Sequence, residues 1–214
     1  RLYEKQPEEL PTFPRGGDFS GLNVTMPYKK TVVPYCAALS DDAQETGSVN
    51  TLVRRSDGAL YGDNTDVFGF LFLVRESGIG VAGKDTLVLG SGGASAACTA
   101  ALRRLGAGSV TVISRRGEDN YGNLEKHRNA EVLVNTTPLG MYPETGTAPV
   151  DLCRFPALSG VLDVIYNPTR TALLLQAEKR GIPHADGLTM LAAQAKKSAE
   201  LFMGREIPEE AIRE

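Results

Sequence analysis

The 214-residue chain contains 42% hydrophobic and 23% charged residues, the balance of a soluble globular protein with one large domain or two small ones. Its formal net charge of -3 provides no basic field to hold a phosphate backbone, so we expect a small-molecule ligand and no nucleic acid partner. No apolar stretch approaches the roughly 18 residues that span a bilayer, which predicts no membrane association and a cytoplasmic location.

The first third of the chain predicts an α/β lobe without a glycine-rich phosphate loop. Strands are expected at residues 21–25 and 48–54, and helices at 29–39 and 41–45. A helix at 67–77 would join this lobe to the rest of the chain, and a terminal helix at 188–203 would pack back across it.

From Gly83 onward, short β-branched runs alternate with helical stretches, which is typical of successive βα units in a parallel sheet. Strands are expected at 86–89, 109–113, 131–135 and 161–166, and helices at 93–105 and 171–180. The predicted fold class is therefore α/β with two lobes. The first comprises residues 1–78, completed by the C-terminal segment 188–214, and the second is a Rossmann-like doubly wound domain at 79–187.

The cysteines and histidines are too scattered to suggest a redox or metal centre. Cys36, Cys98 and Cys153 lie far apart and form no CxxC pair, which favours reduced thiols in the cytoplasm. His127 and His184 each stand alone, so a zinc or iron site would lack its usual ligands. We therefore expect no metal.

A candidate phosphate loop lies between the strand at 86–89 and the following helix. Gly90, Gly92, Gly93 and Ala94 are small enough to let the backbone approach a pyrophosphate held at the helix N-terminus. The third small position of the dinucleotide fingerprint is Ser95 rather than glycine, so a glycine-rich turn without a ligand is the alternative interpretation.

Three polar residues, Ser114, Arg115 and Arg116, follow the second predicted strand of this domain. An NAD enzyme would place an acid here to bind the ribose 2′-hydroxyl, whereas guanidinium groups offer fork-shaped donors to a 2′-phosphate. This pattern favours NADP (NADPH) as the cofactor. In the alternative interpretation, the arginines are solvated loop charges that Glu118 and Asp119 neutralise.

Five motifs, in this order, resemble those of the shikimate dehydrogenases: NVTMPYK at 23–29, GSVNT at 47–51, GDNTD at 62–66, NTTPLGM at 135–141 and GLTMLAAQA at 187–195. The resemblance extends from about residue 21 to residue 203. It implies a reversible, NADP-dependent reduction of 3-dehydroshikimate to shikimate, a step of aromatic amino acid (chorismate) biosynthesis.

The resemblance also implies a role for individual residues. Lys29 and Asp66 correspond to the catalytic pair of the family. The substrate pocket would be lined by Thr25, Asn50, Tyr166 and Gln194, and the cofactor would be contacted by Gly90, Gly92, Gly93, Ala94, Ser114, Arg115, Arg116, Val164 and Gly187.

These residue types suit the chemistry. Reduction of a ketone leaves charge on oxygen as hydride arrives, and a lysine can stabilise that charge and supply a proton. Amide and hydroxyl side chains at Asn50, Thr25 and Gln194 suit a polyol, because each ring hydroxyl needs a hydrogen-bond partner. In the alternative, Lys29 and Asp66 are an ordinary surface ion pair. Asn23 is as well suited to holding a loop as to binding substrate, so we leave it outside the predicted site.

The two ends of the chain depart from the family pattern. Members of the family begin with a strand, a loop whose two serines bind the substrate carboxylate, and a helix, whereas residues 1–4 here resemble the second strand. We expect a form without those serines to bind NADPH but to turn shikimate over poorly. A helix is expected at 208–214, and more sequence is expected to follow it.

Other functions compete with this interpretation. A quinate/shikimate or aminoshikimate dehydrogenase would share the motifs, and a catalytically impaired NADP-binding regulatory protein would retain the fold. A methylenetetrahydrofolate dehydrogenase ranks below these, because a folate site favours aromatic stacking and the chain has no Trp. We expect the protein to be a monomer or a homodimer.

Overall fold

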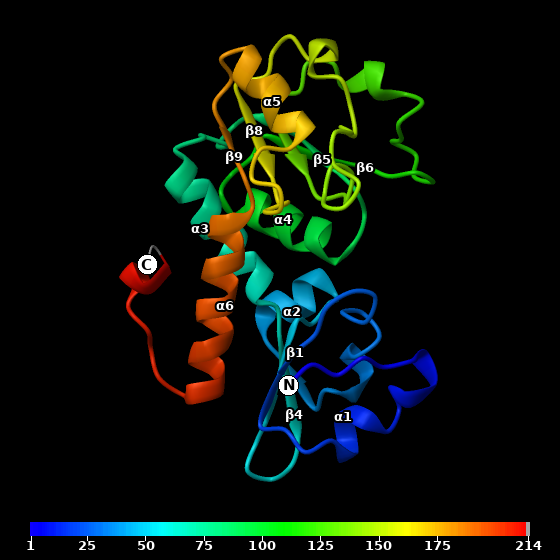
Figure 1. The fold of residues 1–214 in the computed structure, drawn as a ribbon, viewed down its shortest axis with the longest axis vertical. Helices are drawn as coiled ribbons and strands as arrows, with labels where there is room; N and C mark the ends of the chain where they lie inside the picture. The colour runs from blue at the N-terminus through cyan, green and yellow to red at the C-terminus, as the bar shows by residue number, and fades with distance from the viewer. Residues whose placement is uncertain (213–214) are drawn as a thin grey trace.

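The computed structural model describes residues 1–212, apart from the side chains at positions 14 and 15, and it contains two β-sheets in two lobes (Figure 1). The lower lobe in Figure 1 holds a four-stranded mixed sheet, and the upper lobe holds a five-stranded parallel sheet. The helix α6 (Leu188–Met203) descends from the upper lobe along the side of the lower one. The predicted α/β fold class with two lobes is confirmed.

The sheet of the lower lobe has the strand order β1-β3-β4-β2. Its centre is an antiparallel hairpin of β3 (Thr51–Arg54) and β4 (Leu60–Asp63), with Gly58 at a positive φ of 83° in the turn. The hairpin is flanked by β1 (Gly21–Asn23) and β2 (Ala38–Leu39). The helix α2 (Asp41–Thr46) follows β2, and the short elements before β1 are η1 (Pro7–Glu9) and α1 (Phe13–Gly16).

Two expectations for this lobe are wrong. Residues 29–39 are not a helix: they form turns, the 3-10 segment η2 (Val33–Tyr35) and then β2. Pro34 has no N–H to donate in the middle of the segment, and the branched residues before it also weaken a helix. Residues 1–4, expected to be a strand, are irregular. The strands β2 and β4 were not predicted, because β2 has only two residues and β4 contains Gly62 and Asp63, which are types depleted in strands.

The upper sheet has the order β6-β5-β7-β8-β9, with every neighbouring pair parallel. The expected strand at 109–113 is confirmed by β6 (Ser109–Ile113), and strands at the other expected places are β5 (Asp85–Leu89), β7 (Val132–Asn135) and β8 (Gly160–Asp163). The strand at 161–166 was predicted too long, because the backbone beyond Asp163 turns back onto its carboxylate. The two-residue strand β9 (His184–Ala185) was not predicted.

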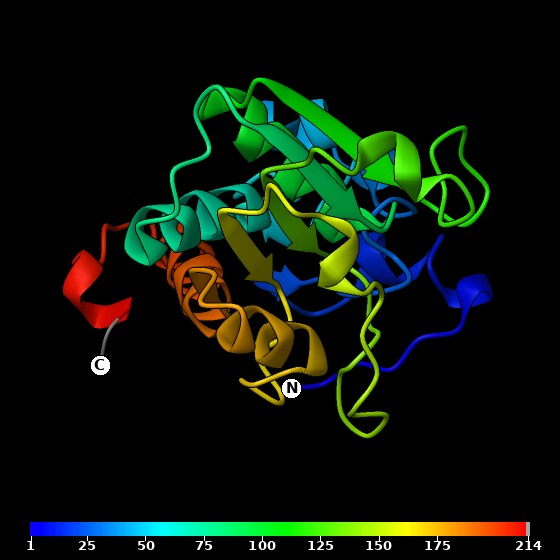
Figure 2. The ribbon, with the colours of Figure 1, turned by 90° about the horizontal axis from the view of Figure 1, so that it is seen from above.

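Helices cover both faces of the upper sheet. One face packs against α3 (Thr65–Ser77), α4 (Gly93–Arg104) and α6, through a core that includes Phe70, Leu102 and Val134. The other face packs against α5 (Ala172–Lys179) and the 3-10 segments η3 (Leu124–His127) and η4 (Leu152–Arg154). Seen from above, α3 and α6 lie side by side at one flank of the sheet (Figure 2).

The terminal helix was predicted correctly at 188–203, and Gly204 ends it at a positive φ of 62°. Within the predicted helix at 208–214, the structure has the 3-10 segment η5 (Glu209–Ile212), and the last two positions lie outside the described residues. Among residues 1–212, no helix is both long enough and apolar enough to cross a membrane.

Candidate active site between the lobes

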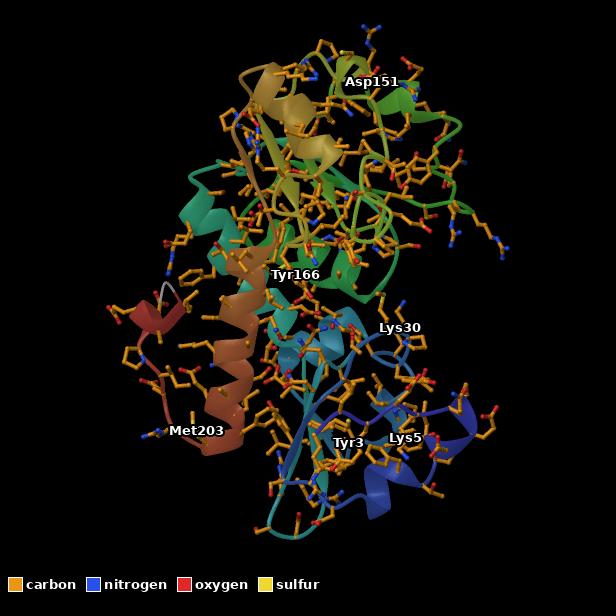
Figure 3. The ribbon with its side chains drawn as sticks, viewed as in Figure 1. Tyr3, Lys5, Lys30, Asp151, Tyr166 and Met203 are labelled. Atoms are coloured by element: carbon orange, nitrogen blue, oxygen red, sulfur yellow. The ribbon has the colours of Figure 1, made fainter. Side chains whose placement is uncertain are left out.

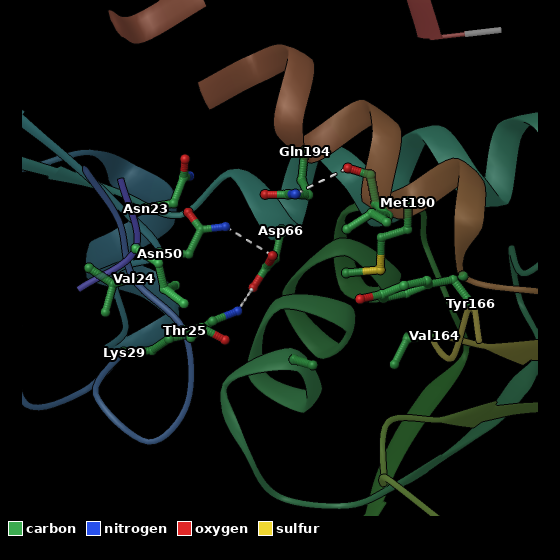
Figure 4. A pocket seen from close by; sticks show the side chains of 14 residues that line it. Asn23, Val24, Thr25, Lys29, Asn50, Asp66, Val164, Tyr166, Met190 and Gln194 are labelled. Carbon is green, nitrogen blue, oxygen red and sulfur yellow. Dashed lines mark hydrogen bonds and ion pairs between the residues drawn. The ribbon is translucent and has the colours of Figure 1, made fainter. Parts of the chain in front are cut away.

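A pocket of about 450 Å³ opens where the two lobes meet (Figure 4). Its walls come from the end of β1, the start of β3, the first turns of α3 and α4, the loop after β8, and α6. Tyr166, in the loop after β8, marks the junction of the lobes in Figure 3. The residues that line the pocket are Leu2, Asn23, Val24, Thr25, Lys29, Asn50, Asp66, Ala94, Val164, Tyr166, Gly187, Met190, Leu191 and Gln194.

An ion pair lies in the wall of the pocket. Lys29 Nζ donates a hydrogen bond to Asp66 Oδ2 at 2.6 Å, and the two side chains are only 18% and 9% exposed. Asp66 is in the first turn of α3, where the positive end of the helix dipole favours a carboxylate. Lys29 lies in the turn after β1, and its carbonyl accepts the N–H of Val49 at 2.7 Å. The turn is therefore tied to the segment that enters β3.

Asn50 holds the other oxygen of the carboxylate. Its Nδ2 donates to Asp66 Oδ1 at 2.9 Å, and its Oδ1 accepts the backbone N–H of Thr65 at 2.9 Å. Because a backbone N–H can only donate, the amide of Asn50 has one possible orientation. Asp66 is thus bound on one side by an ammonium and on the other by an amide (Figure 4).

The lysine also touches the first turn of α4 in the other lobe. A Cβ placed on Gly93 would lie 3.2 Å from Lys29 Cδ, so the lysine stem packs against the backbone of that turn. The absence of a side chain at Gly93 leaves room for this crossing. The ion pair therefore lies beside the segment expected to bind phosphate.

Three further predicted substrate residues face the same pocket. Thr25 lies exposed after β1, and Tyr166 is 47% exposed on the opposite side. Gln194 projects from α6, where its Nε2 donates to the carbonyl of Leu191 at 3.1 Å. The structure therefore brings Thr25, Lys29, Asn50, Asp66, Tyr166 and Gln194 together, along with Ala94, Val164 and Gly187 of the predicted cofactor set.

The predicted phosphate loop has the geometry that a dinucleotide needs. Gly90 has a φ of 107°, and a Cβ there would lie 2.7 Å from Thr136 Oγ1. Gly92 is the N-cap of α4, and within residues 1–212 no side chain caps the first N–H groups of this helix. A Cβ on Gly92 would meet open space, so the approach to these donors is clear. Uncapped donors at a helix N-terminus bind phosphate, so these residues fit the cofactor.

The arginines after β6 also fit a dianion. Arg115 and Arg116 are exposed, and neither forms an ion pair with Glu118 or Asp119 in the described part of the chain. The Asp119 carboxylate lies 2.8 Å from His127 Nε2 instead. The alternative in which the two acids neutralise the arginines therefore has no support in this geometry. Ser114 and both arginines, like Gly90, Gly92 and Gly93, lie outside the pocket lining.

A second network of buried polar groups supports the loops behind the pocket. Asp163, at the end of β8, accepts hydrogen bonds from Asn135 Nδ2 at 3.0 Å, Thr171 Oγ1 at 2.8 Å and the N–H of Ile165 at 3.1 Å. Burial raises the pKa of Asp163 to about 6, and these three donors lower it only in part. The hydrogen bonds to this carboxylate therefore hold the start of the loop that carries Val164 and Tyr166, two residues of the pocket lining.

Several residues of the pocket were not predicted. Asn23, which we left outside the site, lines it and donates to Ser198 Oγ at 3.0 Å. Met190 and Leu191 share a helical face with Gln194 because they precede it by four and three positions, so helical spacing alone would have identified them. The other two, Leu2 and Val24, lie outside any helix and have no comparable pattern in the sequence.

The fold and the pocket together define a two-lobed protein with a dinucleotide-binding domain and a polar cleft beside the phosphate loop. A family model described as the shikimate dehydrogenase substrate binding domain matches residues 3–52. The shikimate dehydrogenase (NADP(+)) of Thermosynechococcus vestitus is 38% identical over 208 residues, which cover 88% of this chain and 72% of that protein. The enzyme of the same name from Oleidesulfovibrio alaskensis is 40% identical over 204 residues, with the same coverage.

The three-dimensional structure agrees with these sequence matches. Shikimate 5-dehydrogenase from Thermus thermophilus, in complex with NADP(H) and shikimate, superposes with a TM-score of 0.85 at 33% identity, covering 98% of this chain and 85% of that one. The chain belongs to the shikimate dehydrogenase family.

Proposed function

We propose that this protein is an NADP-dependent shikimate dehydrogenase, an oxidoreductase that acts on a CH–OH group and reversibly reduces 3-dehydroshikimate to shikimate in chorismate biosynthesis. The observation that carries the proposal is the Lys29–Asp66 pair, held by Asn50 and lying beside the first turn of α4. Similarity to enzymes of that name over most of the chain supports it. We place the activity in the cytoplasm, in keeping with the free Cys36, Cys98 and Cys153.

The proposed division of labour follows the two lobes. Residues 1–78, with the C-terminal segment 188–214, bind the substrate, and residues 79–187 bind the cofactor. Gly90, Gly92, Gly93 and Ala94 would hold the pyrophosphate at the N-terminus of α4. The 2′-phosphate would lie among Ser114, Arg115 and Arg116, and Val164 and Gly187 would contact the rest of the cofactor at the pocket. Bound NADPH would supply the hydride.

Lys29 carries the proton chemistry in this proposal. Its Nζ donates a hydrogen bond to the ketone oxygen, stabilises the charge that develops there, and transfers a proton to it. In the reverse direction, the same nitrogen accepts the proton of the shikimate hydroxyl. Asp66 positions the ammonium with Oδ2 and accepts a substrate hydroxyl, and Asn50, at the pocket wall, holds that carboxylate. Thr25, Tyr166 and Gln194 provide partners for the remaining hydroxyls.

The test is turnover of shikimate by the purified protein with NADP or NAD, followed by the ultraviolet absorbance of the reduced cofactor. NADP-dependent turnover with little activity on quinate would support the proposal. Faster turnover of quinate would favour a quinate/shikimate dehydrogenase. NADPH binding without turnover of shikimate or quinate, even after the family's N-terminal strand and serine loop are added, would favour a regulatory protein. The same preparation, analysed by light scattering, tests the expected monomer or homodimer.

A further inference from the structure

Ser198 lies on the side of α6 that faces the substrate-binding lobe, and only 1% of it is exposed. Its Oγ lies within hydrogen-bond distance of side chains from three elements: Asn23 Nδ2 at 3.0 Å, Thr51 Oγ1 at 2.8 Å and Thr65 Oγ1 at 3.0 Å. These contacts join the terminal helix to β1, β3 and the first residue of α3. A single hydroxyl therefore connects three segments that carry residues of the pocket.

The direction of each hydrogen bond follows from the groups that only donate or only accept. Because the N–H of Thr65 donates to Asn50 Oδ1, the amide nitrogen of Asn50 is the atom that donates to Thr65 Oγ1, at 3.0 Å. Thr51 Oγ1 donates to Asn50 Oδ1 at 2.9 Å, since that oxygen has no hydrogen to give. Thr51 then accepts from Ser198, and Ser198 accepts from Thr65.

The four side chains thus close a ring in which every hydrogen bond runs in the same sense. Ser198 donates to Thr51, Thr51 to Asn50, Asn50 to Thr65, and Thr65 back to Ser198. All four residues are buried, and hydrogen bonds arranged head to tail polarise one another in such surroundings. The second N–H of Asn50 points out of the ring to Asp66 Oδ1, at 2.9 Å.

We infer that Ser198 is a positioning residue for the proposed reaction, on which this inference rests. Through the ring it holds the amide of Asn50 against Asp66, and it thereby fixes the carboxylate that orients the Lys29 ammonium. Ser198 is not part of the pocket lining, so it acts through Asn50 rather than on the substrate. Ser198 in this way couples α6, which packs against the substrate-binding lobe, to Asp66 and Lys29.

Removal of the serine hydroxyl would release the hydroxyl of Thr65. That hydroxyl has two other acceptors within reach, Asn50 Oδ1 at 3.2 Å and Gln194 Oε1 at 3.4 Å. Either choice changes the hydrogen bonding of a residue that faces the pocket. Thr51 would at the same time lose its nearer donor, and Asn23 would lose its nearer acceptor.

The experiment compares Ser198→Ala with the unaltered protein. We expect kcat/KM for shikimate to fall about ten-fold, equivalent to about 1.4 kcal/mol, while the KM for NADP stays unchanged. In the Asn50→Ala background, Ser198→Ala should have no further effect, because its route to Asp66 is already lost. Thr51→Val breaks the same ring from β3 and should reproduce the kinetic pattern, which also covers the case that Ser198→Ala folds poorly.

The matched control is Thr86→Val, which removes another buried hydroxyl, near the start of β5 and outside the pocket, and should leave kcat/KM unchanged. Unchanged kinetics in Ser198→Ala, or an equal loss with and without Asn50, would overturn the inference. If the unaltered protein does not turn over shikimate even when the family's N-terminal strand and serine loop are added, the proposed function fails. The ring is then tested by urea unfolding: additive effects of Ser198→Ala and Asn50→Ala reject it, and coupled effects support it.

Discussion

Lys29 and Asp66 lie 37 positions apart in the sequence, yet Lys29 Nζ is 2.6 Å from Asp66 Oδ2. Exposed ion pairs contribute little, because solvent screens them and their side chains remain mobile. This pair is different, since both side chains are mostly buried and Asn50 binds the second carboxylate oxygen. The alternative of an ordinary surface ion pair therefore does not describe these residues.

Lys29→Met should abolish most of the activity while preserving cofactor binding. Methionine keeps an unbranched apolar stem against Gly93 but removes the ammonium that would transfer the proton. General acid–base groups contribute roughly 10²- to 10⁴-fold, so we expect kcat to fall by about that factor. The measurement is steady-state turnover of shikimate together with an NADPH fluorescence titration. The control is Lys30→Ala, an exposed neighbour, and a comparable loss there would contradict a specific role for Lys29.

Arg104 links the two lobes outside the pocket. From the end of α4 it forms ion pairs with Asp42 at 2.6 Å and Glu45 at 2.5 Å, both on α2. Because the arginine side chain is 37% exposed, we expect Arg104→Gln to cost only about 0.2–1 kcal/mol of unfolding free energy. The loss should appear in urea unfolding at low salt and shrink at high salt. The adjacent Arg103→Gln removes the same charge without these pairs, and an equal effect would rule out the contact as the cause.

Gly187→Ala should disturb the loop after β8. A Cβ at this position would lie 2.0 Å from the carbonyl oxygen of Val164, and backbone cannot give way as a flexible side chain can. We expect a cost of about 1–3 kcal/mol in unfolding free energy, because overpacking forces the backbone to shift, and a higher KM for NADP. Gly80→Ala is the control, since a Cβ there meets no atom within 4 Å. Equal behaviour of the two variants would contradict the steric explanation.

Arg115→Ala and Arg116→Ala should weaken the binding of NADP without weakening the binding of NAD. Hydrogen bonds to charged groups contribute about 1.5–3 kcal/mol, so we expect the KM for NADP to rise about 10- to 100-fold in the variant that loses the main contact. The KM for NAD should not change, because NAD lacks the 2′-phosphate. The ratio of the two KM values is the measurement. Arg128→Ala, an exposed arginine after η3, controls for net charge, and a parallel change for NAD would contradict 2′-phosphate recognition.

The sequence predicted the parallel domain better than the smaller lobe. The partly buried edge strand β6 is rich in branched residues, and α6 is bounded by Gly187 and Gly204, so the residue pattern and the glycines at the ends indicated both elements. In the smaller lobe, β2 has only two residues, and half of the four residues of β4 are Gly62 and Asp63, which are types depleted in strands. Residues 29–39 do not form the predicted helix, because Pro34 lacks the N–H that a helix interior needs, although the apolar pattern favours a helix.

The candidate site was predicted through motifs rather than through geometry. Residues within a motif, such as Lys29 and Asp66, were found because their types and order resemble those of a family. Ser198 was missed because its role depends on packing between α6 and distant elements, to which the sequence offers no local signal. The hydrogen bonds from Ser198 to Thr51 and Thr65 join residues more than a hundred positions apart, so only the three-dimensional structure reveals them.

Asp163 should make the protein less stable as the pH rises. Burial raises its pKa from the ordinary 3.8 to about 6, so the folded state binds this proton more tightly than the unfolded state does. The stabilisation from this group is therefore complete below the unfolded pKa of 3.8 and is lost as the pH rises through about 6. Two pKa units correspond to about 3 kcal/mol as an order of magnitude.

Asp163→Asn removes the titration and keeps the hydrogen bonds. Its Oδ1 still accepts from Asn135 and Ile165, and its new amide donates to Thr171 Oγ1, whose hydroxyl can turn. The measurement is urea unfolding between acid and neutral pH, in which the stability of the unaltered protein should fall relative to Asp163→Asn. Asp151→Asn, on the surface of the upper lobe (Figure 3), is the control with the opposite sign, because the Cys153 N–H lowers the pKa of Asp151. Parallel pH curves for the unaltered protein and Asp163→Asn would show that the Asp163 carboxyl titrates at its ordinary value.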